Sequence, residues 1–298
     1  MNKGIAIAFL TYFLFSTGDA GIKVLGGRLP VFEILFFVML THLLTLGFVK
    51  PANETWRDAL RVRNPKLVAL RAACAIIAGI GGVTAFTTLP FAEAYALLFL
   101  MPAFTTLLSI PFLGEQVGWR RWSAVLLGFA GVLLVVKPGF QALSIGHFAA
   151  AGAALAGATS MIVLRKIGAV ERRTTLLAAI YVSSVALNGI LMSPAFVVPT
   201  GFDFGILVLA GLVGSIAQVL MIGVTRVIPA NQVANIQYSQ MIWAVVFGAV
   251  IFNEWPDAIA VVGMLFVGAS GIITLRREVA RRGLSRREFL QEPPPGEI

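Results

Sequence analysis

The chain has 298 residues, of which 58% are hydrophobic and 12% are charged. A soluble domain carries about 25% charged residues, so this composition excludes an ordinary soluble protein and indicates a polytopic helical membrane protein. The net charge of +9 would suit a nucleic-acid-binding protein, but the positions of the basic residues, given below, favour a lipid surface.

Ten apolar runs follow one another along the chain, and each approaches the ~20 residues that cross ~30 Å of hydrocarbon as a helix. They are long, rich in Leu, Ala and Gly, and do not alternate, which argues against strands. We therefore predict an all-α polytopic membrane protein with ten transmembrane helices. The runs cover residues 4–24, 31–49, 67–88, 91–113, 119–136, 146–165, 174–197, 204–226, 230–252 and 257–275.

Two further segments are too polar to span a membrane. Residues 51–65 contain Trp56 and Leu60 four positions apart and are predicted to form a short interfacial helix or a solvated loop. Residues 277–298 end in a proline run and are predicted to be a disordered cytoplasmic tail.

The basic residues gather on one side of the predicted membrane. If the ten runs alternate in direction, 20 of the 23 Lys and Arg residues fall on the side that holds both termini, and the other side keeps only Lys23, Arg28 and Lys137. By the positive-inside rule, both termini are cytoplasmic. We expect a multi-pass protein of the cell inner (plasma) membrane, in contact with the bilayer and with no nucleic-acid partner.

Weak internal repeats divide the chain into two halves. Pro90 and Pro229 lie 139 residues apart, as do Glu115 and Glu254. A second echo, at an offset of 142, relates Gly4, Thr17 and Lys23 to Gly146, Thr159 and Arg165. We predict related halves at 1–139 and 146–276. Because five spans invert the second half, the halves would form an inverted repeat, an arrangement common in secondary transporters.

Each half carries a further signature at its fourth span. A long apolar run that follows Pro90 or Pro229 ends in Gly114-Glu115 or Asn253-Glu254, and a glycine-spaced helix comes next. These features resemble the EamA family of the drug/metabolite transporter superfamily over residues 4–276. The resemblance implies a ten-helix transporter, and the polar and aromatic ninth span looks most like the amino-acid exporters of that group, the aromatic ones included. The P-loop pattern is absent, so ATP is not expected to drive transport directly.

The ninth span is predicted to line the substrate cavity. Asn231, Asn235 and Tyr238 fall on one helical stripe, which offers two amides and a phenol to a zwitterionic ligand. The equivalent stripe of the fourth span is small and apolar and ends in an aromatic ring. The cavity set also includes Gln237 and Trp243 in the ninth span and Tyr95, Ala96 and Phe99 in the fourth. The alternative is that these groups bond neighbouring helices as structural contacts.

Other spans offer weaker candidates. In the first span Asp19 and Lys23 could form a proton or amine site, but we favour an ion pair between them near the outer interface. Glu93, at the outer start of the fourth span, is left as a possible coupling group. Further candidates for the cavity are Ser16, Thr159, Met161 and Gln218. Pro102 interrupts the fourth span as a kink, for gating or for packing.

The remaining titratable residues are interpreted as structural. Glu115 is expected to pair with Arg120 or Arg121, and Glu254 is placed on the opposite face. His42 and His147 have no nearby carboxylate in the sequence and are interpreted as packing residues. No metal-binding or nucleophile motif occurs, so neither a cofactor nor a metal is expected.

The predicted function is export of a small metabolite, with an amino acid as the first choice, by alternating access through a central cavity. A transporter of a nucleoside, an S-adenosylmethionine-like cofactor or a drug is the alternative within the same superfamily. A membrane-embedded enzyme is the alternative of another class, disfavoured because paired catalytic groups are missing. The oligomeric state is left open between a monomer and a homodimer.

Overall fold

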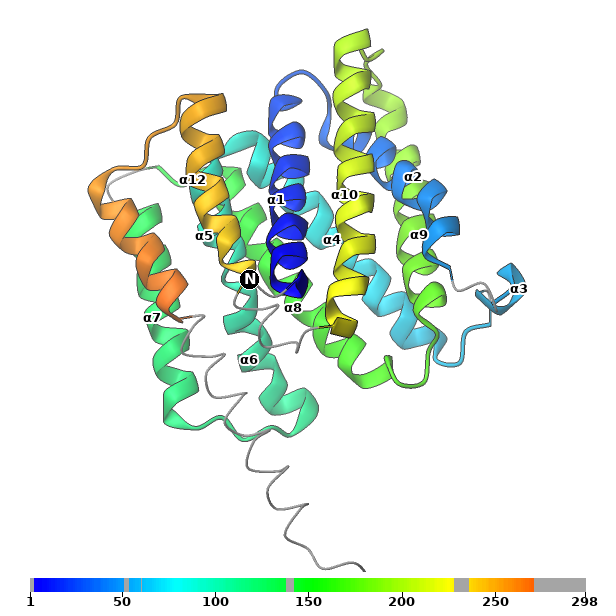
Figure 1. The fold of residues 1–298 in the computed structure, drawn as a ribbon, viewed down its shortest axis with the longest axis horizontal. Coiled ribbons are helices and arrows are strands. Elements are labelled where there is room, and N and C mark those ends of the chain that lie inside the picture. The colour runs from blue at the N-terminus through cyan, green and yellow to red at the C-terminus, as the bar shows by residue number, and fades with distance from the viewer. Residues whose placement is uncertain (1–2, 51–53, 60, 138–141, 228–235, 271–298) are drawn as a thin grey trace, which may run out of the picture.

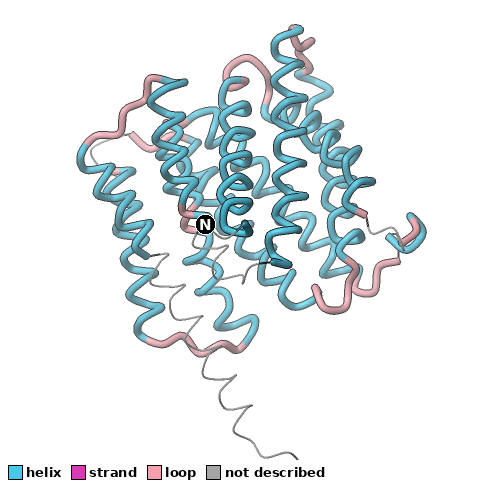
Figure 2. Tube along the Cα trace, in the orientation of Figure 1, coloured by secondary structure: helices cyan, strands magenta, loops and turns pink. Residues whose placement is uncertain are grey.

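The computed structural model describes residues 3–50, 54–59, 61–137, 142–227 and 236–270. Every regular element within these ranges is helical, and most loops lie at the two ends of the bundle (Figures 1 and 2). The elements are α1 (Lys3–Val24), α2 (Val31–Val49), α3 (Trp56–Ala59), α4 (Pro65–Thr88), α5 (Phe91–Leu98), α6 (Met101–Leu113), α7 (Trp119–Val136), α8 (Ile145–Ile167), α9 (Arg173–Met192), η1 (Ser193–Ala195), α10 (Gly201–Val227), α12 (Ser239–Phe252) and a last helix at Ala258–Ser270.

Ten apolar helical segments are present in the described ranges. Seven are long enough to span a membrane, one of them formed by α5 and α6 together. The three shorter ones cover Trp122–Val136, Ser239–Phe252 and Ala258–Ser270. The ten segments coincide with the ten predicted runs, which confirms the all-α polytopic class. The four-residue helix α3 falls in the polar segment 51–65, where a short helix was one of the two predictions.

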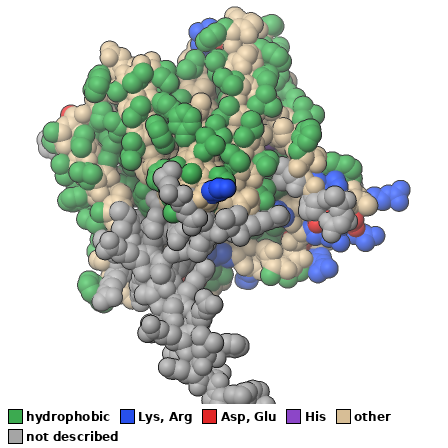
Figure 3. All heavy atoms as spheres, viewed as in Figure 1, with side chains coloured by type: hydrophobic (Ala, Val, Ile, Leu, Met, Phe, Trp, Pro, Cys, Tyr) green, Lys and Arg blue, Asp and Glu red, His purple; other side chains and the backbone are tan. Residues whose placement is uncertain are grey.

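The outside of the bundle is apolar, as a lipid-facing surface requires. Phe48 is 88% exposed, Val250 78% and Leu44 70%. On the face shown in Figure 3, hydrophobic side chains cover much of the upper part, and Lys and Arg side chains gather toward the lower right. An apolar surface this extensive is unfavourable in water, so it indicates contact with hydrocarbon.

The two ends of the bundle differ in how their charges are paired. We call the end where α4, α7 and α9 begin the basic end, and the opposite one the far end. The three basic residues predicted for the far end each contact a carboxylate: Lys23 with Glu254 (2.9 Å), Arg28 with Asp203 (2.7 Å), and Lys137 with Asp257. The far end therefore carries little net positive charge, in keeping with the asymmetry of the loops.

The core is built around α5. Phe91, Ala94 and Ala96 are fully buried, and Tyr95 is 4% exposed. One cluster of buried side chains joins α5 to α1, α4, α7, α8, α12 and the last helix. Because α5 is surrounded on all sides, its polar side chains must find partners on neighbouring helices.

Small residues allow close helix contacts. A Cβ atom added to Gly131 of α7 would lie 2.5 Å from the Gly263 carbonyl oxygen, and one added to Gly263 would lie 2.5 Å from that of Gly131. The backbones of α7 and the last helix therefore touch, as small residues permit in membrane bundles. These two helices are the fifth spans of the two predicted halves.

The fourth and ninth spans are both broken; the interruption of the fourth at Pro102 was predicted, whereas the ninth was predicted as one continuous run. In the fourth span α5 ends at Leu98 and α6 begins at Met101. Pro102 explains the position, because its ring clashes with the carbonyl four residues earlier, on Leu98. In the ninth span a turn at Tyr238 precedes α12, and residues 228–235 lie outside the described ranges.

Candidate functional site

Three layers of paired side chains run down the middle of the bundle. On α1, Ser16, Asp19 and Lys23 recur at helical spacing and share one face. On α5, Phe91 and Tyr95 do the same, and Phe99 follows at the C-cap. Tyr95 joins the two faces at the level of Asp19, and two further layers follow, Lys23 with Glu254 at the far end and Phe99 with Tyr238 at the helix breaks.

The middle layer is a buried hydrogen-bond network. The Tyr95 hydroxyl donates to Asp19 Oδ2 at 2.5 Å and lies 3.2 Å from Ser16 Oγ, which is fully buried. Gln240 of α12 is a further hydrogen-bonding neighbour of Tyr95. A hydrogen bond to a charged group contributes about 1.5–3 kcal/mol, and an ionisable side chain inside a membrane bundle normally faces a partner or a cavity. Asp19 is therefore the candidate group for a cation at membrane depth.

The deepest layer is a pair of stacked rings at the two helix breaks. The Phe99 and Tyr238 centroids are 5.2 Å apart and the ring planes differ by 18°. The two residues are 139 positions apart, so they are equivalent in the two predicted halves. A crevice of about 10 Å³ beside the rings, reaching Gly128 and Ser270, has room for about one water molecule.

More aromatic rings extend this wall. Tyr95 lies 6.3 Å from Phe99 and so connects the carboxylate layer to the stacked pair. On the other side Trp243 packs edge-on against Phe13 at 4.9 Å. The Trp243 Nε1 atom is buried and has no partner among the described residues. A buried indole N–H normally finds an acceptor, so this donor is available to a ligand.

The far-end layer is the Lys23–Glu254 ion pair. Lys23 Nζ contacts Glu254 Oε1 at 2.9 Å and donates to the Leu89 carbonyl at 2.6 Å. Glu254 in turn accepts the Phe91 N–H at 2.7 Å. Leu89 and Phe91 flank the turn between α4 and α5, where backbone groups lack helical partners. The pair therefore ties α1 to that turn and to the end of α12.

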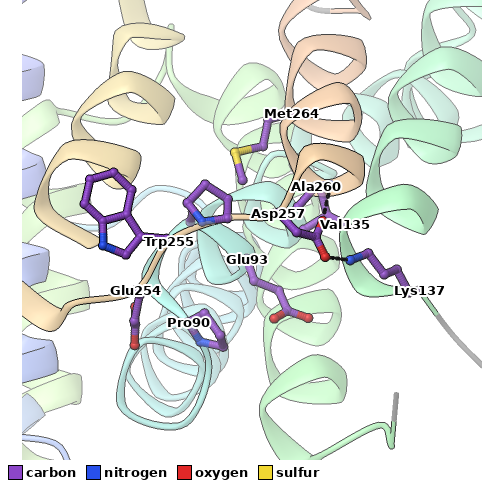
Figure 4. A pocket seen from close by; sticks show the side chains of 11 residues that line it. Pro90, Glu93, Val135, Lys137, Glu254, Trp255, Asp257, Ala260 and Met264 are labelled. Atoms are coloured by element: carbon purple, nitrogen blue, oxygen red, sulfur yellow. Dashed lines mark hydrogen bonds and ion pairs between the residues drawn. The ribbon is translucent and has the colours of Figure 1, made fainter. Parts of the chain in front are cut away.

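A pocket of about 270 Å³ opens at the far end beside this pair (Figure 4). Its lining includes Glu93 and Glu254 together with the Lys137–Asp257 pair. The ammonium of Lys137 and then the Ala260 N–H hold the pKa of the Asp257 carboxyl below its usual value. Glu93 also contacts His147 Nε2 at 2.9 Å. The three carboxylates that line the pocket thus each have a cationic or ring-nitrogen neighbour. A pocket whose charges are already paired is better suited to be an entrance than a charge-selective binding site.

The predicted site residues divide into three groups. Ser16, Asp19, Tyr95, Phe99 and Tyr238 meet in the layers described above, and Ala96 is fully buried on α5 beside them. Asn231 and Asn235 lie outside the described residues. The third group is not part of the hydrogen bonds and ring contacts that form these layers. Gln237 lies just before the turn at Tyr238, and Gln218 is half-buried on α10. Thr159 donates a hydrogen bond to the Leu155 carbonyl of its own helix, and Met161 is 38% exposed.

Two predictions about charged residues are wrong. Lys23 pairs with Glu254 rather than with Asp19, whose carboxylate accepts from Tyr95 instead. Glu115 contacts Arg165 of α8 at 3.4 Å, and its predicted pairing with Arg120 or Arg121 stays a prediction, because those two side chains lie outside the described ones.

The second error concerns His147, whose carboxylate partner is Glu93, 54 residues earlier. Both errors have one cause, because the true partners come from other spans.

Comparison with protein families supports a transporter. The sequence profile described as "EamA-like transporter family" matches residues 2–137 and again 144–276. A solved structure titled "Crystal structure of protein" superposes on this chain with a TM-score of 0.67 and 19% identity. The superposition covers 95% of this chain and 99% of that chain, which shows a shared fold.

Individual relatives carry several substrate names. The chain is 25% identical to the S-adenosylmethionine uptake transporter of Rickettsia felis, over 97% of each chain. It is 26% identical to the riboflavin transporter of Rhizobium johnstonii, over 84% of this chain and 80% of that one. It is also 28% identical to the pseudopaline exporter CntI of Pseudomonas aeruginosa, over 90% and 94%.

Proposed function

Since the chain belongs to the EamA-like transporter family, we propose that it is a secondary transporter for a small metabolite that carries a planar ring and a cationic nitrogen or sulfur. This chemistry describes a nucleoside-type cofactor such as S-adenosylmethionine. It fits the cofactor alternative of the sequence analysis better than the amino-acid prediction.

One observation carries the proposal, namely that a carboxylate and a ring-stacking platform are joined by a single side chain. The Tyr95 hydroxyl bonds Asp19, and the Tyr95 ring lies beside Phe99, which stacks on Tyr238. A planar ring that enters between Phe99 and Tyr238 exchanges one stacked contact for two. An ammonium or sulfonium group one helical turn away would then compensate the Asp19 charge.

The relatives support the planar ring of the proposed substrate, and the S-adenosylmethionine transporter also supports the cation. Two of the names quoted above are S-adenosylmethionine and riboflavin, and both molecules contain a fused heteroaromatic ring. An aromatic amino acid also combines a ring with an ammonium group, so it remains the second candidate. Threonine lacks a ring, so its transport distinguishes a general amino-acid transporter from one that requires a ring.

We place the basic end in the cytoplasm and assign alternating access as the mechanism. The two halves would rock about the Phe99–Tyr238 contact, and the layers on either side of it would separate in turn. The broken fourth and ninth spans suit this motion, since interrupted helices line the sites of many such transporters.

Flux into liposomes tests the function. The purified full chain is reconstituted, and uptake of S-adenosylmethionine, riboflavin, phenylalanine and threonine is measured in both directions. We expect S-adenosylmethionine to be transported and Asp19→Asn to abolish its flux. The matched control is Asp203→Asn, which removes a carboxylate of the far end that pairs with Arg28. Transport of threonine alone, or equal flux for the two Asp variants, would contradict the proposal.

A further inference from the structure

Two ion pairs occupy equivalent positions at opposite ends of the bundle. Lys23 and Arg165 correspond at the offset of 142, and Glu254 and Glu115 correspond at the offset of 139. The structure joins Lys23 to Glu254 at 2.9 Å at the far end and Arg165 to Glu115 at 3.4 Å at the basic end. Each pair links the first helix of one half to the end of the fourth helix of the other half.

We propose that Lys23–Glu254 and Arg165–Glu115 are the two gates of the transport cycle, one at each end, that both are closed in this structure, and that they open in alternation. The proposal rests on the alternating-access part of the proposed function but not on the identity of the substrate. The four residues are positioning residues, because they hold the two halves together at the ends of the bundle and need not touch the substrate.

The two pairs are not equally tight. The side chains of Lys23 and Glu254 are 11% and 30% exposed, whereas those of Arg165 and Glu115 are 42% and 34% exposed. Lys23 also binds the Leu89 carbonyl and lies 5.1 Å from the centre of the Phe252 ring, and Glu254 binds the Phe91 N–H. An ion pair that is shorter and less exposed to solvent resists separation more than an exposed one. The far gate is therefore the harder of the two to open.

The position of the far gate supports its role. It lies between the pocket of about 270 Å³, which Glu254 lines, and the Asp19–Tyr95 layer on the same faces of α1 and α5. In this proposal the ion pair lies on the route of a solute from that pocket to the stacked rings. Arg28–Asp203 lies at the same end, but its positions have no equivalent charged pair in the other half, since Val170 and Asn64 stand at the corresponding offsets.

The gating proposal predicts effects of opposite sign, which a purely structural role would not produce. The reporter is a cysteine at the fully buried Ser16, introduced as Ser16→Cys in a Cys74→Ser background, and its reaction with an impermeant maleimide is followed from each side of the membrane. Lys23→Ala should raise labelling from the far side by about fivefold, which corresponds to ~1 kcal/mol lost from a pair of this kind. Arg165→Ala should lower labelling from the far side and raise it from the basic side.

Two further variants keep the test decisive. Glu254→Gln removes the charge but keeps an acceptor for the Phe91 N–H, so it should reproduce Lys23→Ala if that variant folds poorly. The charge exchange Lys23→Glu with Glu254→Lys should restore labelling toward the parent value. Arg28→Ala is the matched control and should leave the ratio of labelling from the two sides unchanged.

The proposal fails if the Lys23 and Arg165 variants shift the ratio in the same direction, if neither shifts it, or if Arg28→Ala shifts it as much as Lys23→Ala. Labelling needs no substrate, so these outcomes are independent of the flux assays. If the two variants shift labelling in opposite directions but the protein does not transport S-adenosylmethionine, the gating proposal stands and the substrate proposal fails.

Discussion

The rings of Phe99 and Tyr238 stack on each other 5.2 Å apart, although 139 residues separate them in the chain. They occupy equivalent positions in the two predicted halves, and each lies at the break of a membrane-spanning segment. In the predicted inverted repeat, only residues close to the two-fold axis would contact their own equivalents. We therefore propose this contact as the centre of the substrate site, which is expected at the repeat interface in transporters of this kind.

Truncation of the stacked pair should affect substrates according to their rings. Tyr238→Ala removes one face of the platform, and we expect binding of a ring-bearing substrate to weaken by about 1–3 kcal/mol. Threonine binding, if any, should change less. Equilibrium binding in detergent measures both effects, with Tyr181→Ala as the control, because Tyr181 packs against His42 away from this site. Equal losses for Tyr238→Ala and Tyr181→Ala would show that the effect is a general loss of packing.

The hydrogen bond between Tyr95 and Asp19 separates two roles for the carboxylate. Tyr95→Phe keeps the ring and removes the hydroxyl that donates to Asp19 at 2.5 Å. If Asp19 binds the substrate cation, this variant should still bind substrate, with a loss of at most about 150-fold, since a hydrogen bond to a charged group contributes about 1.5–3 kcal/mol. Asp19→Asn should abolish binding. Binding assays that find the two variants equally defective would make Asp19 a structural acceptor for Tyr95.

The topology can be tested with two equally exposed positions. Leu143 and Val170 are both 45% exposed and lie at opposite ends of α8. In a Cys74→Ser background, Leu143→Cys should react with an impermeant thiol reagent added to intact cells, and Val170→Cys should react only after the cells are opened. Reaction of both from the same side would contradict the ten-span arrangement.

The contact between α7 and the last helix predicts a stability difference between two neighbouring glycines. A Cβ on Gly263 would lie 2.5 Å from the Gly131 carbonyl oxygen, whereas one on Gly268 meets nothing within 4 Å. Gly263→Ala should therefore destabilise the fold by about 1–3 kcal/mol through overpacking. Gly268→Ala should be neutral or stabilising by up to about 1 kcal/mol, from helix propensity. Thermal unfolding in detergent compares them, and a similar melting temperature for both would exclude the close contact.

The Lys137–Asp257 pair predicts a small dependence of stability on pH. Because the folded pKa of Asp257 lies below its unfolded value, the stabilisation is present above the unfolded pKa and is lost as the pH falls through the folded pKa. The melting temperatures of the parent and Asp257→Asn should thus differ at neutral pH and converge in acid. A difference that persists unchanged to the most acidic pH tested would mean that the ion pair is not its source.

The sequence by itself determined the class, the number of spans and the asymmetry of charge. Apolar runs of about 20 residues form helices in lipid, because each backbone N–H and C=O group must be hydrogen-bonded within its own segment. That requirement is local, so it can be found in the sequence without knowledge of any neighbour. The short helix in segment 51–65 was also predicted from a local feature, the spacing of Trp56 and Leu60. Pro102 likewise predicted the interruption of the fourth span, because proline lacks an N–H and its ring clashes with the preceding turn.

The tertiary structure alone decided which charges and rings meet. Asp19 and Lys23 stand one turn apart and were predicted to pair, yet Lys23 reaches Glu254 and Asp19 accepts from Tyr95. A partner on another span is a matter of how helices pack, and residues 231 positions apart, such as Lys23 and Glu254, carry no local trace of their contact. Burial makes such pairs strong, since a charge inside the bundle must find a partner there, whichever part of the chain supplies it.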